Sequence, residues 1–103
     1  MSLIKVCKAG DIPVGGMQRF LLDENTPVAI YHVGDAFYAT SDNCTHGTAS
    51  LSEGDLCGEI IECPFHGGSF NCRTGAPVDA PCSIPLQCYA VEIKGDDLFV
   101  DAL

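Results

Sequence analysis

The sequence predicts an all-β protein, and three observations support that fold class. Short apolar runs alternate along the chain with clusters of Gly, Pro, Asn and Asp, as is typical of strands joined by turns. No segment keeps a helical period of apolar residues over about ten positions. A Gly34-Asp35 turn separates two apolar runs, and glycine supplies the positive φ that a tight hairpin requires. We therefore expect antiparallel strands.

The apolar runs define the expected strands in order. They cover residues 4–7, 17–22, 28–33, 36–40, 88–94 and 98–100. The last two flank a second turn, around Gly95-Asp96. The intervening segment, about residues 42–85, is rich in loops, and a long irregular region in a small domain is usually functional or held by something other than a core. We expect the strands to form a scaffold and residues 42–85 to carry the site.

Length and charge limit the classes of function. The chain has 103 residues, so we expect one domain over residues 1–103. Its 14 acidic and 5 basic residues give a net charge of −9, which disfavours nucleic acid and anionic membrane surfaces and suits a basic protein partner. No stretch approaches the ~20 apolar residues of a membrane span. Residues 1–5 show no secretory signal, so we expect a cytoplasmic protein.

The chain has seven cysteines. In the reducing cytosol, cysteines are more often metal ligands, catalytic groups or small buried apolar residues than disulfide partners. Two clusters stand out in the loop-rich segment, Cys44-Thr45-His46-Gly47 and Cys63-Pro64-Phe65-His66-Gly67-Gly68. Two thiolates and two imidazoles suit either Zn²⁺ or an iron–sulfur centre. A Cys₂His₂ zinc finger pairs its two cysteines in one knuckle and places its histidines on a helix. Here each loop supplies one of each residue and no helix is expected, which favours a two-iron cluster with mixed ligands.

The spacing C-x-H-x16-C-x2-H resembles that of the Rieske [2Fe-2S] proteins, and the glycine after each histidine and the proline after the second cysteine also agree. The resemblance implies a Rieske-type antiparallel β-sandwich with a small cluster-binding subdomain, about residues 42–85, made of two ligand loops. It implies one [2Fe-2S] cluster, with Cys44 and Cys63 on the inner iron. His46 and His66 would bind the outer iron through Nδ1.

Other positions indicate which kind of Rieske protein this sequence resembles. High-potential members have a disulfide between the ligand loops, but this chain has Ala49 and Phe65 at the matching positions. Those members also have a serine and a tyrosine that donate to cluster sulfurs, where this chain has Gly68 and Phe70. We therefore expect a potential near the low end of the Rieske range. The Gly75-Ala76-Pro77 segment resembles the proline-containing loop that covers the cluster in this family.

A small low-potential Rieske protein is similar to the ferredoxin components of bacterial aromatic-ring-hydroxylating dioxygenases, such as the carbazole, biphenyl and naphthalene systems. The resemblance implies a one-electron carrier between an NAD(P)H-dependent flavin reductase and a terminal oxygenase. The chain itself is not expected to be an enzyme, because an oxygenase iron site typically needs two further histidines and a carboxylate, and only His32 remains. The alternatives are a structural Cys₂His₂ zinc module in protein interaction and the small Rieske-like subunit of a nitrite reductase. Many of the latter have lost ligands that this chain keeps.

The remaining cysteines are expected to be small buried apolar residues or unreactive thiols. They are Cys7, Cys57, Cys72, Cys82 and Cys88. The sequence leaves open whether Cys72 and Cys82 pair. His32 lies in an expected strand and is interpreted as structural, and Phe65 and Phe70 either shield the cluster or serve in the core.

Four acidic residues lie between the ligand loops. They are Glu53, Asp55, Glu59 and Glu62. Such charges usually form a solvated face, and here they are also candidates for steering a redox partner with a basic docking surface.

Overall fold

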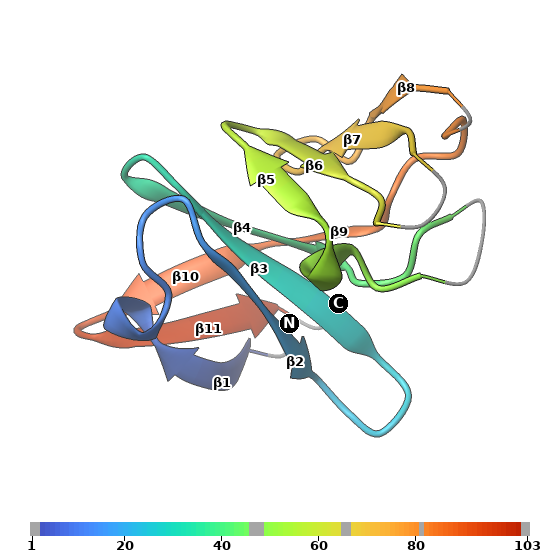
Figure 1. The fold of residues 1–103 in the computed structure, drawn as a ribbon. Coiled ribbons are helices and arrows are strands. Elements are labelled where there is room, and N and C mark those ends of the chain that lie inside the picture. Colours follow the sequence, from blue (N-terminus) through green and yellow to red (C-terminus); the bar gives the residue numbers. More distant parts are fainter. Residues whose placement is uncertain (1–2, 46–48, 65–66, 81, 102–103) are drawn as a thin grey trace.

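The fold is all-β, with strands in three antiparallel sheets (Figure 1). The computed structural model describes residues 3–45, 49–64, 67–80 and 82–101. Within these ranges the strands are β1 (Leu3–Lys8), β2 (Met17–Leu21), β3 (Pro27–Val33), β4 (Ala36–Ser41), β5 (Asp55–Cys57), β6 (Ile60–Glu62), β7 (Ser69–Asn71), β8 (Pro77–Asp79), β9 (Cys88–Tyr89), β10 (Val91–Lys94) and β11 (Asp97–Asp101). Two short 3-10 helices accompany them, η1 (Ala9–Asp11) and η2 (Leu51–Glu53).

Each sheet has a simple strand order. Sheet A runs β1-β11-β10, sheet B runs β2-β3-β4-β9, and sheet C runs β5-β6-β7-β8. Figure 1 shows sheet C stacked above the other two, with the long strands of sheet B in the middle. The expected all-β class is confirmed, and strands occupy the expected scaffold runs, with one interruption in the run 88–94. No helix in the described ranges has the length and apolar character of a membrane span.

Strand β3 is buried on both faces and joins two cores. Val28 and Ile30 pack in the core between sheets A and B, together with Leu98 of β11. Ala29 and Tyr31 pack in a second core that includes residues of sheet C. Successive side chains of a strand point to opposite faces, so an unbroken apolar run is what a strand buried on both faces requires. All four β3 residues are fully buried.

The structure differs from the expected strands in two places. The run 88–94 is interrupted at Ala90, because β9 pairs with β4 in sheet B and β10 pairs with β11 in sheet A. The segment 42–85, expected to be irregular, contains sheet C. Its strands have three residues each, too few to show an alternating pattern in the sequence.

Candidate metal centre

The first predicted ligand loop leaves the end of β4. The Cys44 N–H donates to the Ala49 carbonyl at 3.0 Å, and an isolated bridge pairs Asn43 with Ser50. These contacts close the loop at its base. Cys44 is only 5% exposed, so its side chain points inward.

The second loop leaves the end of β6 and is closed in the same way. The Cys63 N–H donates to the Gly68 carbonyl at 3.2 Å. Gly68 stands five residues after its cysteine, as Ala49 does after Cys44. Gly67 and Gly68 both have positive φ, at 66° and 71°, a conformation that a side chain would strain. Both loops are therefore closed by the same hydrogen bond, from the cysteine N–H to the carbonyl five residues later. Cys63, like Cys44, is 5% exposed.

Both cysteines belong to one buried core. Cys44 and Cys63 pack in the same cluster, which also contains Phe70 and Cys82. Two buried thiols presented by equivalent loops supply the sulfur half of the donor set that a mixed Cys–His cluster requires. The residues present thus fit the predicted group as far as sulfur ligands are concerned.

The imidazole half of the predicted ligand set, His46 and His66, lies outside the described residues. Phe65, the aromatic residue expected to shield the cluster, lies outside them as well. Among the residues that are described, no three His, Cys, Asp or Glu side chains form a group that could hold a metal ion. The assignment of the histidines therefore stays a prediction.

A third buried cysteine, Cys82, packs in the same core as the two predicted ligand cysteines. Burial raises the pKa of the Cys82 thiol, a hydrogen bond with the Cys44 side chain opposes that rise, and the nearby Cys63 adds to it. Cys82 lies outside the Cys–His motif and was expected to be a small buried apolar residue or an unreactive thiol. The available sequence signal was a pair of nearby prolines, Pro81 and Pro85. Each proline ring fixes φ, so the two residues restrict the backbone near Cys82.

The segment around Ile84 contacts the first ligand loop. The Thr45 hydroxyl donates to the Ile84 carbonyl at 2.7 Å. The expected covering segment, Gly75-Ala76-Pro77, makes different contacts. A Cβ on Gly75 would meet the Leu86 carbonyl oxygen at 2.6 Å and Cys88 Sγ at 2.8 Å, so this glycine allows a close approach to the chain leading into β9.

A buried carboxylate, Asp42, forms hydrogen bonds at the base of the first loop. Asp42 is fully buried, and its Oδ1 accepts a hydrogen bond from the Ser52 N–H at 2.9 Å. Its backbone carbonyl accepts from the Leu51 N–H at 2.7 Å. Asp42 therefore ties the start of the loop to η2, which follows the loop. No feature of the local sequence marks Asp42 for this role.

A glycine brings the two ligand loops together. A Cβ on Gly54, just after η2, would overlap the carbonyl oxygen of Glu62 and lie 3.2 Å from that of Leu51. Glu62 immediately precedes Cys63. The absence of a side chain at Gly54 thus lets the chain after the first loop pack against the strand that enters the second.

No disulfide is formed by any of the seven cysteines, all of which lie in the described ranges. Cys72 and Cys82 are therefore not joined. Phe70 is fully buried in the same core as the ligand cysteines, where it has no hydroxyl to donate. His32 is structural, as predicted: its Nδ1 lies 2.8 Å from the Ile12 carbonyl oxygen, and its ring stacks on Phe37 at 3.9 Å.

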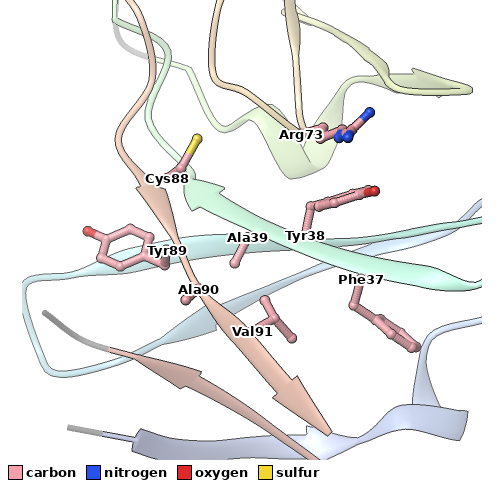
Figure 2. A pocket seen from close by; sticks show the side chains of 8 residues that line it. All are labelled: Phe37, Tyr38, Ala39, Arg73, Cys88, Tyr89, Ala90 and Val91. Atoms are coloured by element: carbon pink, nitrogen blue, oxygen red, sulfur yellow. The ribbon is translucent and has the colours of Figure 1, made fainter. Parts of the chain in front are cut away.

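A shallow pocket of about 390 Å³ lies away from the ligand loops. Figure 2 shows its lining, which comes from β4, β9 and β10 together with Arg73. Neither Cys44 nor Cys63, the two predicted ligands in the described ranges, lines it. Arg73 also lies 3.9 Å from Glu59, so one of the four acidic residues between the loops has a cationic partner.

Comparison with known proteins identifies the family. Residues 2–90 match the Rieske [2Fe-2S] domain. The chain is 53% identical over 97 residues to the ferredoxin CarAc of Metapseudomonas resinovorans, covering 94% of this chain and 91% of that protein. It is 40% identical over 101 residues to the ferredoxin component of biphenyl 2,3-dioxygenase from Rhodococcus jostii, covering 98% and 94%. In a solved complex of reduced oxygenase and oxidized ferredoxin in carbazole 1,9a-dioxygenase, one chain is 52% identical and superposes with a TM-score of 0.92, over 95% of this chain and 91% of that one. The chain belongs to the Rieske [2Fe-2S] family, and within it to the electron-carrying ferredoxin components of aromatic-ring dioxygenase systems.

Proposed function

We propose that this protein takes single electrons from an NAD(P)H-dependent flavin reductase and delivers them to the terminal oxygenase of an aromatic-ring-hydroxylating dioxygenase. One observation carries the proposal: two equivalent loops, each closed by a cysteine N–H, present two buried cysteines to one core. The similarity to the carbazole and biphenyl dioxygenase ferredoxins supplies the class of partner.

In this proposal Cys44 and Cys63 bind one iron, and His46 and His66 bind the other. When bound, the cluster takes up and releases one electron. The chain shields the two cysteine ligands from water and positions the second ligand loop. The cysteines are held away from water, and the positive φ of Gly67 and Gly68 shapes the turn that returns the second loop to Cys63.

The charge of the protein supports docking to a basic partner. The net charge is −9, and Glu53, Asp55 and Glu62 are exposed between the ligand loops. Complementary charges accelerate encounter, and salt screens that effect. We expect the rate of electron transfer to fall as ionic strength rises; a rate that does not change with salt would contradict this part of the proposal.

The proposed partner carries out the oxygenation. A mononuclear iron site of two histidines and a carboxylate cannot be assembled here once His46 and His66 hold the cluster. His32 is the third and last histidine of the sequence, and it is engaged with Ile12 and Phe37.

We further propose that residues 1–103 form a single domain in the cytoplasm, with a cluster-binding subdomain at about residues 42–85. The core that β3 shares with sheet C supports one folding unit. The absence of disulfides among seven cysteines suits a reducing compartment.

Reconstitution tests the proposal. Purified ferredoxin, a flavin reductase and the oxygenase of carbazole 1,9a-dioxygenase are expected to oxidise carbazole with NADH only when all three are present. Cys44→Ser should abolish turnover and visible absorption, whereas Cys57→Ser, at an exposed cysteine outside the site, should change neither. A colourless protein containing zinc would support the structural alternative instead, and turnover without the ferredoxin would refute the carrier role.

A further inference from the structure

The pocket of about 390 Å³ opens beside strand β4, at the point where its neighbour β9 ends. The pairing of β9 with β4 covers only Ala39 and Thr40. At Ala90 the chain leaves sheet B and enters β10 of sheet A. Strand β4 extends past this point through Tyr38 and Phe37, whose side chains line the opening (Figure 2). The pocket is therefore a consequence of the place where two sheets part.

The wall of the pocket is largely aromatic. Phe37, Tyr38 and Tyr89 are half-buried, and Val91 lies beside them in the lining. Tyr38 packs against the core that includes sheet C, whereas Phe37 and Tyr89 pack against the core between sheets A and B. Both cores thus hold these rings in place. Ligand pockets in proteins measure about 300–1,000 Å³, so a pocket near the small end of that range suits a ligand with one ring.

Arg73 is the one charged residue in the described lining of this pocket. It is also the only lysine or arginine in the sequence between residues 42 and 85, a segment rich in acidic residues. In Figure 2 its guanidinium lies above the ring of Tyr38. The pocket therefore combines an aromatic wall with a single cation.

Hydrogen bonds fix the turn that carries Arg73. The Asn71 side-chain oxygen accepts from the Arg73 N–H at 2.9 Å and from the Thr74 N–H at 3.2 Å. The guanidinium itself lies 3.9 Å from the Glu59 carboxylate, beyond hydrogen-bond distance, and it donates no hydrogen bond to any residue in the described ranges. Its N–H donors are therefore available to a ligand.

These features favour a small aromatic monocarboxylate as the ligand. The planar guanidinium matches a carboxylate, which it can bind through two parallel hydrogen bonds. An aromatic wall favours a ring in offset or edge-to-face contact. The net charge of −9 repels a second negative charge, so a monoanion suits this protein better than a phosphate dianion.

We propose that this pocket binds an aromatic monocarboxylate of about the size of benzoate, whose carboxylate pairs with Arg73 and whose ring lies against Tyr38. The ligand would join the turn between β7 and β8 to β4, and thereby sheet C to sheet B. The proposal does not depend on the electron-carrier function, because neither Cys44 nor Cys63 lines the pocket.

Isothermal titration calorimetry of the oxidised holoprotein with benzoate tests the site. We expect a dissociation constant of about 0.1–1 mM, as suits a ligand with few atoms. Benzyl alcohol lacks the charge and acetate lacks the ring, so each should bind at least about tenfold more weakly. Equal binding of either compound, or no binding of benzoate up to about 10 mM, would overturn the proposal.

Three substitutions test the role of the guanidinium. Arg73→Gln should weaken benzoate binding about ten- to a hundredfold, as expected for a lost hydrogen bond between charged groups. Glu59→Gln removes the competing carboxylate but keeps an acceptor for the Asn71 amide, and it should tighten binding about two- to fivefold.

Lys94→Gln is the matched control, because Lys94 is a cation outside the pocket, 5.6 Å from the centre of the Phe99 ring. It should leave the affinity within about twofold of the wild type. Circular dichroism shows that each variant is folded. Binding by Arg73→Gln as tight as by the wild type, or an equal loss in Lys94→Gln, would refute the proposed site.

Amide chemical shifts locate the bound ligand. In the nitrogen-15-labelled oxidised holoprotein, benzoate should shift the amide signals of residues 37–39, 73 and 88–91, which line the pocket. Shifts confined to other residues would place benzoate elsewhere and would overturn the assignment of this pocket.

Discussion

Arg19 Nε lies 3.2 Å from Oδ2 of Asp42, a carboxylate with no exposed surface. The contact is an ion pair and not a hydrogen bond: within the described part of the chain, that oxygen has no hydrogen-bond partner. The other oxygen is satisfied by the Ser52 N–H. Removing one partner of a buried charge leaves the other uncompensated, so the half-exposed Arg19 on β2 stabilises the base of the first ligand loop.

Replacing Arg19 is therefore expected to weaken the fold. Arg19→Gln should lower the free energy of unfolding by about 1–3 kcal/mol, and adding Asp42→Asn should recover part of that loss. Urea denaturation of the holoprotein, followed by visible absorption, measures both. Arg73→Gln is the control, since its ion pair with Glu59 is exposed on both sides and should cost less than about 1 kcal/mol. Equal losses for Arg19→Gln and Arg73→Gln would contradict this account.

Gly54 is expected to tolerate no side chain. Gly54→Ala places a Cβ against the Glu62 carbonyl, and relieving that overlap must separate η2 from β6. We expect a loss of about 1–3 kcal/mol, the usual cost of overpacking, and poorer cluster incorporation, because Cys63 follows Glu62. Gly10→Ala is matched to it, as a Cβ there meets nothing within 4 Å. Thermal denaturation and the iron content per chain give the comparison, and equal behaviour of the two variants would be inconsistent with the close contact.

The hydrogen bond between Tyr31 and Thr40 should respond asymmetrically to substitution. Their hydroxyls lie 2.8 Å apart, and Thr40 donates to the Ser41 carbonyl, so Tyr31 is the donor of the pair. Tyr31→Phe leaves Thr40 bonded and should cost about 0.5–1.5 kcal/mol. Thr40→Val leaves the buried phenol without its acceptor and should cost about 1–3 kcal/mol. Urea denaturation of both variants checks the order, which the reverse result would disprove.

Stability should decline in alkali. Burial raises the pKa of the Cys72 thiol to about 12, with Glu59 contributing further. Because the folded pKa lies above the ordinary value of 9.0, the contribution of this thiol is complete below about pH 9 and is lost as pH rises toward 12. Burial raises the pKa of Tyr31 in the same direction. Cys72→Ala should flatten the fall of unfolding free energy between these pH values, measured without oxygen; an unchanged slope would remove Cys72 from the explanation.

The midpoint potential itself is expected near the low end of the range from about −150 to +300 mV known for Rieske centres. The physical reason is the lack of hydroxyls at Gly68 and Phe70, the second of which is fully buried in the core of the ligand cysteines. Protein-film voltammetry or an EPR-monitored titration gives the value. A midpoint above about +100 mV, in the upper half of that range, would contradict the low-potential assignment.

The scaffold was predictable because its strands are long enough to show a pattern. The apolar run of β3 and the Gly34-Asp35 turn indicate a hairpin without any tertiary information. Sheet C was not predictable, since strands such as β5 and β6 have three residues. The motif locates Cys44 and Cys63 in two loops, but the packing of Cys82 into their core depends on how a distant segment folds back. Local sequence can indicate a restricted backbone there, but it does not show which distant residues the segment packs against.

Strands β4 and β9 are paired neighbours, with Thr40 opposite Cys88 and the Ser41 N–H donating to the Gln87 carbonyl at 2.8 Å. Everything between them, including both ligand loops and sheet C, therefore begins and ends at one spot on sheet B (Figure 1). Such a segment is an insertion between two paired strands. Its length and loops can change without moving those strands, because the pairing of β4 with β9 holds its two ends together. On another antiparallel pair, the segment would need an apolar surface like that of Ala29 and Tyr31 and a cation placed as Arg19 is for Asp42.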